Sequence, residues 1–118
     1  MLKHKAAANL TAGETLATLG LVDAATNRYY YALYQAAVHA LTRRGWTPGR
    51  LESGAVQWKH SSVRNNIALV RGRPSDRALF DDMRLLRERA DYRPEHVQPS
   101  DLAVHVAEVR AFVEESAR

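Results

Sequence analysis

The side chains most able to do chemistry in this chain are basic residues gathered in its middle third. Residues 43–77 carry eight Lys or Arg and two Asp or Glu, a net charge of +6, whereas residues 78–118 carry a net charge of −3. The basic residues are Arg43, Arg44, Arg50, Lys59, Arg64, Arg71, Arg73 and Arg77. Such a concentration raises the local affinity for anions and suits phosphate or RNA. We expect an anion at the loops on either side of the third predicted helix. The alternative is an arginine-rich surface that is simply solvated.

Other acids, bases and metal ligands are sparse. The chain has no Cys, which excludes disulfides, thiolate catalysis and cysteine-based zinc sites. Its histidines are scattered, with no pair four residues apart: His4, His39, His60, His96 and His105. The glycine-rich phosphate loop, His-Glu-x-x-His and Gly-x-Ser-x-Gly are all missing from the sequence. We therefore predict no metal site and no cofactor, so any reaction would use Arg with a His or a Tyr.

Length and composition predict one cytoplasmic domain over residues 1–118. A chain of 118 residues is typical of one domain, and an apolar content of 46% is typical of a folded one. The apolar runs are too short for a transmembrane helix, and we find no signal-peptide pattern after the basic start. We therefore expect no association with a membrane.

Apolar residues recur at helical spacing along the whole chain, and no segment of useful length alternates as a strand does. The expected helices cover about residues 4–19, 23–44, 53–69, 76–90 and 101–116, with loops at 45–52 and 91–99. The clearest inward stripe consists of Tyr30, Leu33, Ala37 and Leu41 in the second helix. We predict an all-α fold, a single up-and-down bundle of about five helices without a sheet.

Local signals place the helix ends and the inward face of the first helix. The expected N-caps are Asp23, Ser53, Ser75 and Ser100. Gly20 and Gly45 are expected to end the first two helices. In the first helix, the inward positions are expected to include Ala8, Leu16 and Leu19.

Two stretches stand out together. One is Asn27-Arg28-Tyr29-Tyr30-Tyr31-Ala32-Leu33-Tyr34-Gln35-Ala36-Ala37, and the other is Leu86-Arg87-Glu88-Arg89-Ala90-Asp91-Tyr92. They resemble the HEPN superfamily (higher eukaryotes and prokaryotes nucleotide-binding), whose small prokaryotic members carry a Ser-Arg-Ala-Tyr-Tyr-Ala-like opening to the second helix. Those members also carry Arg-x-x-Ala-Asp-Tyr at the end of the fourth. The resemblance covers roughly residues 5–116, including His60 in the third helix and Arg-Ala-Phe-Val-Glu in the fifth.

The resemblance implies an HEPN-like bundle that forms a homodimer through its second and fourth helices. It implies a role in a prokaryotic toxin–antitoxin or antiviral defence system, in which the protein binds or cleaves RNA or a nucleotide. A minimal nucleotidyltransferase is the implied partner protein.

The ribonucleases of this superfamily carry Arg-x4–6-His, whose residues meet across the dimer interface and cleave RNA without a metal. Such cleavage needs a base with a pKa near 7 to take the 2′-hydroxyl proton, and an Arg to stabilise the developing charge. In this chain Tyr92 stands at the position of the His, which argues against cleavage. Arg89 and His96 satisfy the spacing elsewhere, so they are the predicted catalytic pair.

The resemblance also implies a binding site for RNA or a nucleotide, made of Arg28, Tyr30, His60, Arg87, Asp91 and Tyr92. Arginine would hold a phosphate, and Tyr30 or Tyr92 would stack on a base or hydrogen-bond to it. The alternative is structural: Arg87 and Asp91 form a salt bridge within one helix, Tyr92 bonds to Arg28, and His60 is packed. The protein would then be a non-catalytic scaffold or interaction module that has lost the ribonuclease motif.

Overall fold

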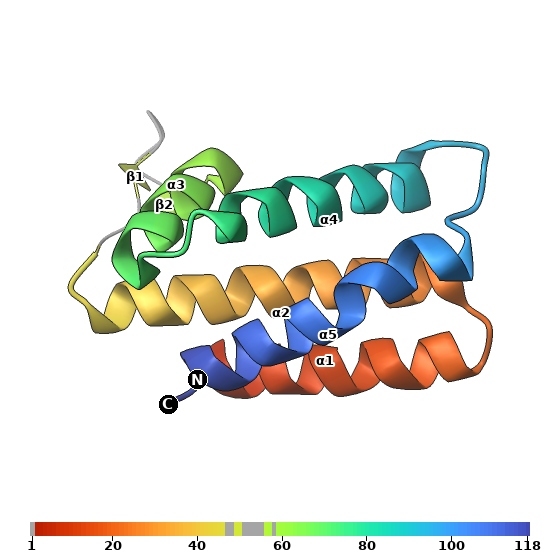
Figure 1. Ribbon diagram of the computed structural model, residues 1–118, viewed down its shortest axis with the longest axis horizontal. Coiled ribbons are helices and arrows are strands. Elements are labelled where there is room, and N and C mark those ends of the chain that lie inside the picture. The colour runs from red at the N-terminus through yellow and green to blue at the C-terminus, as the bar shows by residue number, and fades with distance from the viewer. Residues whose placement is uncertain (1, 47–48, 51–55, 58) are drawn as a thin grey trace.

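Five helices and one very short pair of strands make up the computed structural model of this chain, which describes all residues except 1, 47–48, 51–55 and 58. The helices are α1 (Leu2–Thr18), α2 (Val22–Arg43), α3 (His60–Arg71), α4 (Ser75–Tyr92) and α5 (Pro99–Ser116). The four long helices alternate in direction along the chain (Figure 1). The prediction of an all-α, up-and-down bundle is therefore confirmed.

The central element is α2, which packs against each of the other four helices. Its predicted stripe, from Tyr30 to Leu41, is buried, as expected. Small side chains on its other faces are buried as well: Ala25, Ala32 and Ala36. Because alanine adds little bulk, neighbouring helices can approach the α2 backbone closely on several sides.

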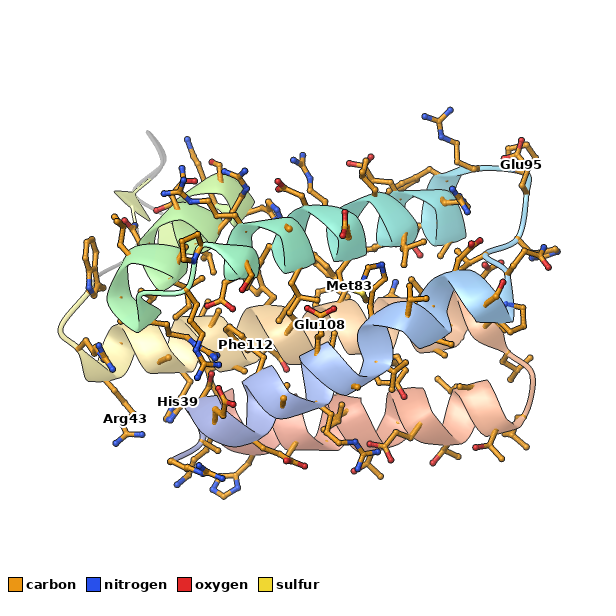
Figure 2. All side chains as sticks on the ribbon, viewed as in Figure 1. His39, Arg43, Met83, Glu95, Glu108 and Phe112 are labelled. Atoms are coloured by element: carbon orange, nitrogen blue, oxygen red, sulfur yellow. The ribbon has the colours of Figure 1, made fainter. Side chains whose placement is uncertain are left out.

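The remaining helices each turn one apolar face toward α2. Met83 on α4 and Phe112 on α5 are buried in the interior, whereas Arg43 and Glu95 lie outside at opposite ends of the bundle (Figure 2). The expected face of α1 was only partly right: Leu16 packs against the core as expected. The residues of α1 that are buried are Ala6, Leu10 and Gly13, while Ala8 and Leu19 are exposed. Gly13 on the buried face lies directly against the ring of Tyr29 on α2.

The start of the third helix was also predicted wrongly, and so was the absence of a sheet. Val56–Gln57 (β2) pairs antiparallel with Gly49–Arg50 (β1), so the backbone is extended where we expected a helix. Lys59 is extended too, and α3 begins only at His60. The predicted cap Ser53 lies outside the described residues. The other helices begin and end within two residues of the predicted positions.

The helix ends follow the predicted glycines but not the predicted caps. Gly20 and Gly45 have φ angles of 79° and 84°, the left-handed conformation that ends a helix. No side-chain cap hydrogen bond forms at α2, α4 or α5. The predicted caps of these helices, Asp23, Ser75 and Ser100, lie inside the first turn instead. None of the helices that the structure describes is both long and apolar enough to cross a membrane.

Gly13 marks the tightest approach of α1 to α2. A Cβ atom at this position would lie 3.1 Å from Cδ2 and Cε2 of Tyr29, whose ring is almost completely buried. We expect Gly13→Ala to lower the free energy of unfolding by about 1 kcal/mol, because overpacking outweighs the gain in helix propensity. Urea denaturation measures this change.

The matched control is Ala17→Gly on the exposed side of α1, which reports the helix-propensity term alone. We expect that term to be about 1 kcal/mol in favour of alanine. A stabilised Gly13→Ala protein would show that the ring of Tyr29 is not confined by α1.

Candidate functional site

The contact between α2 and α4 brings the two motif segments together. The guanidinium carbon of Arg87 lies 5.0 Å from the ring centroid of Tyr30 and 5.4 Å from that of Tyr31. Nη2 of Arg87 also donates to the Tyr31 hydroxyl at 3.4 Å. The Arg87 side chain remains 25% exposed. A cation over two aromatic rings is an attractive arrangement, and here part of it faces solvent.

Asp91 completes the link between the two helices. Its carboxylate lies 3.5 Å from Nε of Arg87, one turn earlier on α4. Asn27 on α2 donates through Nδ2 to both oxygens of Asp91, at 3.0 and 3.2 Å. We did not predict Asn27 as a site residue, although it opens the first motif segment. This contact supports the structural interpretation of Arg87 and Asp91, because the charge of Arg87 already has a partner.

His60 reaches the same place from α3. Its Nδ1 atom lies 3.0 Å from the Tyr30 hydroxyl, and the two rings stack with centroids 6.0 Å apart. Its Nε2 atom lies 4.0 Å from Oδ1 of Asp81, which Arg64 binds at 2.7 Å. We call the group formed by Asn27, Tyr30, Tyr31, His60, Arg87 and Asp91 the Tyr30 cluster.

Burial sets the protonation of the two central rings. Burial raises the pKa of Tyr30, and the positive charge of Arg87 opposes this shift. Burial lowers the pKa of His60, the charge of Arg84 lowers it further, and Asp81 opposes the change. Both rings are therefore neutral at pH 7, and the Tyr30 hydroxyl donates to Nδ1 when the imidazole carries its proton on Nε2.

Two predicted binding residues lie apart from the Tyr30 cluster. Arg28 points to α1, where Nη1 donates to Oδ1 of Asn9 at 3.3 Å. Tyr92, the last residue of α4, is 74% exposed. The alternative prediction of a hydrogen bond between Tyr92 and Arg28 was wrong, because these two residues face different neighbours.

The predicted catalytic residues are each held by a separate carboxylate. Nη1 of Arg89 lies 3.0 Å from Oδ2 of Asp101. Nδ1 of His96 lies 2.6 Å from Oδ2 of Asp23, and Oδ1 of Asp23 accepts the Val97 N–H at 2.8 Å. The imidazole is 85% exposed, so its Nε2 atom is open to solvent. A carboxylate on one ring nitrogen orients the other as a proton acceptor.

Asp23 thus anchors the loop between α4 and α5 to the start of α2. Burial raises the pKa of Asp23, but hydrogen bonds from His96 and Val97, together with the charge of His96, outweigh this effect and lower the pKa overall. Asp23 is therefore ionised at pH 7 and able to hold the imidazole.

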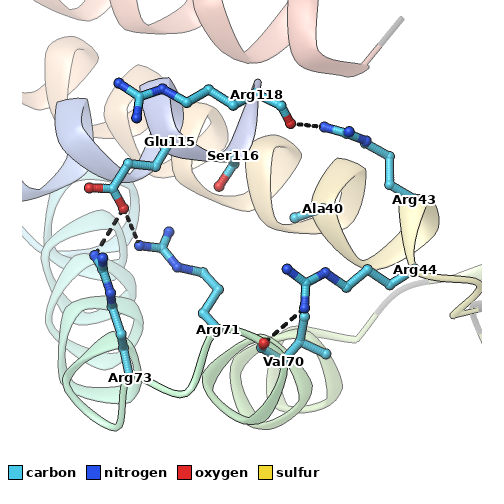
Figure 3. Close-up of a pocket in the computed structure, with 9 residues that line it drawn as sticks. All are labelled: Ala40, Arg43, Arg44, Val70, Arg71, Arg73, Glu115, Ser116 and Arg118. Atoms are coloured by element: carbon cyan, nitrogen blue, oxygen red, sulfur yellow. Dashed lines mark hydrogen bonds and ion pairs between the residues drawn. The ribbon is translucent and has the colours of Figure 1, made fainter.

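Four of the eight basic residues of the middle third meet at the other end of the bundle. Arg43 and Arg44 at the end of α2 line one cavity together with Arg71 and Arg73, which lie on either side of Gly72 (Figure 3). These arginines flank α3 in the sequence, where we expected an anion.

Comparison of this chain with family models, curated proteins and solved structures finds no match. Within the part of the chain that the structure describes, no three His, Asp or Glu side chains are placed to hold a metal ion.

The buried imidazole of His60 gives a testable pH dependence. Because its pKa is lowered on folding, the folded protein binds fewer protons than the unfolded chain just below pH 6.5, the ordinary pKa of His. We expect the melting temperature to fall as the pH drops from 7.5 to 5.5, and to fall less in His60→Gln. Circular dichroism melts at each pH measure the difference.

NMR titration provides the direct check. The imidazole signal that disappears in His60→Gln should show its inflection below pH 6.5. An inflection at or above pH 6.5 would contradict a buried, neutral His60.

Proposed function

We propose that this protein is a small HEPN-like protein of a prokaryotic toxin–antitoxin or defence system that binds RNA or a nucleotide at the Tyr30 cluster. The observation that carries the proposal is the position of Arg87 over the rings of Tyr30 and Tyr31. Two sequence motifs more than fifty residues apart thereby form one group, in which Arg87 and Tyr31 are partly exposed and Tyr30 is buried. Proteins recognise unpaired bases and their phosphates with this combination.

The polar atoms around Arg87 suit a nucleotide more than a simple anion. Asp91 already balances the charge of Arg87, so a lone anion would gain little there. A base has a flat face that can stack and an edge that can hydrogen-bond to carboxylate, amide or hydroxyl groups. Asp91, Asn27 and Tyr31 offer those groups beside the guanidinium.

The proposal includes a homodimer, with a minimal nucleotidyltransferase as the partner protein. Because α2 packs against four helices, a second copy would approach mainly over α4. Leu85 and Tyr92 are exposed on this helix, seven residues apart and thus on one face. Such exposed apolar side chains favour contact with another protein surface.

One observation favours a second candidate function, metal-free RNA cleavage. The bond from Asp23 to Nδ1 of His96 leaves Nε2 oriented toward solvent as a base. Arg89 lies on the last two turns of α4, just before the loop that carries His96, and is the residue proposed to stabilise charge in the transition state.

Binding is tested with a fluorescent single-stranded RNA hexamer that ends in a 5′-hydroxyl, by anisotropy at two salt concentrations. We expect binding that weakens as salt rises, and a loss of roughly tenfold in Arg87→Ala because stacking and charge are both removed. Arg87→Lys keeps the charge but not the planar group, so its affinity should be intermediate.

The matched control is Arg77→Ala, which removes an exposed arginine in the first turn of α4, ten residues before Arg87. Its affinity should stay within about twofold of wild type, since one distant surface charge contributes little. If RNA does not bind, or if both alanine variants bind equally well, the Tyr30 cluster is a structural link and the scaffold function replaces this proposal.

Cleavage is tested by incubating RNA with the purified protein in EDTA. We expect fragments to form, and expect His96→Ala and Arg89→Ala each to reduce the rate by about 100-fold or more. His105→Ala, a histidine on α5 outside this group, is the control and should cleave at the wild-type rate. If the RNA stays intact, the cleavage function is wrong. The binding proposal is unaffected, because the anisotropy experiment tests it separately.

A further inference from the structure

A cavity lies at the end of the bundle opposite His96. It has a volume of about 420 Å³ and is formed by the C-terminal ends of α2, α3 and α5 and the turn before α4 (Figure 3). Five arginines and one acidic side chain, Glu115, line it; the arginines are Arg43, Arg44, Arg71, Arg73 and Arg118. A cavity of this size falls in the range of small-molecule sites. We call it the arginine pocket.

The local sequence explains why arginines gather there. Arg43 and Arg44 precede Gly45, and Arg71 precedes Gly72, so these cations lie at helix C-termini, where the helix dipole favours them. Gly72 has a φ angle of 65°, which turns the chain sharply and brings Arg73 back to the same place. Each helix end accounts for its own arginine, but not for the meeting of several guanidinium groups around one cavity.

Main-chain oxygens hold the rim of the arginine pocket in place. Nη1 of Arg44 donates to the carbonyl oxygen of Val70 at 3.0 Å, and Arg43 donates to the main-chain oxygen of Arg118, the last residue of the sequence. These bonds orient the two side chains, and the neutral Val70 carbonyl leaves the charge of Arg44 uncancelled. Glu115 binds both Arg71, at 2.6 Å, and Arg73, at 2.9 Å, so one carboxylate is shared between two cations. Glu115, together with Asp76 beside Arg71 and the Arg118 oxygen beside Arg43, balances only part of the charge of the five arginines, so the pocket is net positive.

Arg71 forms a fixed floor. Its side chain is 12% exposed, and its guanidinium carbon lies 4.3 Å from the centroid of the Phe112 ring. Its Nε atom lies 3.3 Å from Oδ2 of Asp76. Its Nη1 atom and the hydroxyl of Ser116 are both buried, and neither has a hydrogen-bond partner among the described residues. Ser116 also lines the cavity. Two buried polar groups at the floor are thus left for a ligand, although a buried donor without a partner is costly.

We propose that the arginine pocket binds a compact oligophosphate, either the phosphate chain of a free nucleotide or the 5′-triphosphate end of an RNA. Several cations around one cavity favour a ligand that carries several negative charges close together. Phosphate oxygens accept from guanidinium forks and from a serine hydroxyl alike. The anchored side chains are already placed, so little conformational freedom is lost on binding. This site is separate from the Tyr30 cluster, and the inference does not rest on the proposed function.

The test uses sodium tripolyphosphate as the probe, with titration calorimetry and thermal melts of the full chain. We expect the melting temperature to rise with millimolar tripolyphosphate, beyond the effect of sodium sulfate at equal ionic strength. Arg44→Gln and Arg73→Gln change exposed rim residues, so both variants should fold, and each should bind at least about tenfold more weakly. Circular dichroism checks the fold.

The matched control is Arg77→Gln, which removes an exposed arginine of the same basic segment that does not line this cavity. It should bind tripolyphosphate as wild type does. Arg87→Ala should also keep tripolyphosphate while it loses the 5′-hydroxyl RNA, so the two proposals fail separately. Tripolyphosphate that has no more effect than sulfate, or that binds the rim variants as tightly as wild type, overturns the inference.

Competition identifies the source of the oligophosphate. Displacement of tripolyphosphate by ATP but not by adenosine assigns the pocket to a free nucleotide. Displacement by a 5′-triphosphate RNA hexamer at lower concentration than ATP, and not by the 5′-hydroxyl hexamer, assigns it to an RNA end. Equal displacement by both RNA hexamers would show that the pocket binds backbone phosphates, and would overturn the oligophosphate assignment.

Discussion

The constraint on which the rest of this structure depends is the burial of α2 by four neighbours at once. A helix can be covered on so many sides only if several of its side chains are small, and α2 provides Ala25, Ala32 and Ala36 for this purpose. Large aromatic residues then fit only where a neighbour leaves room. Tyr29 fits against Gly13 of α1, and Tyr30 against His60 of α3. The positions of the tyrosines follow from this packing.

Because α2 spans the bundle, it contributes to all three polar groups described above. Asp23 at its start holds His96, Asn27 and Tyr30 along its length meet α4 and α3, and Arg43 and Arg44 at its end line the arginine pocket. The two ends are thus chemically different. One presents a histidine oriented by a carboxylate, and the other presents an excess of guanidinium groups.

Arg87 and Arg71 have similar contacts in different parts of the bundle. Arg87 lies over Tyr30 and Tyr31 and pairs with Asp91, whereas Arg71 lies over Phe112 and pairs with Asp76 and Glu115. Each guanidinium is fixed by an aromatic ring and an acid. Each also has one buried donor without a hydrogen-bond partner among the described residues, Nη1 of Arg71 and Nε of Arg87. They differ in their surroundings: Arg71 lies in a cavity lined by four further arginines, whereas Arg87 lies beside Asn27 and Asp91.

The sequence by itself determined most of the helices, because apolar spacing and helix-ending glycines are local signals. Gly20 and Gly45 end α1 and α2 as predicted, and the stripe from Tyr30 to Leu41 is buried. The same local signals misplaced the start of α3, where Val56 and Gln57 pair with residues earlier in the chain. A cap prediction at Asp23 also failed, since its carboxylate meets a loop more than seventy residues away.

Of the candidate site, the sequence indicated residue types and the tertiary structure decided which of them meet. It brought Arg87, Tyr30 and His60 together, turned Arg28 toward α1, and left Tyr92 in solvent. The tertiary structure also brought the arginines that precede α3 and those at its C-terminal end into one cavity. Periodicity reports only which face of a helix is apolar. Which side chains from separate helices share a site depends on how those faces pack, and that is a property of the whole bundle.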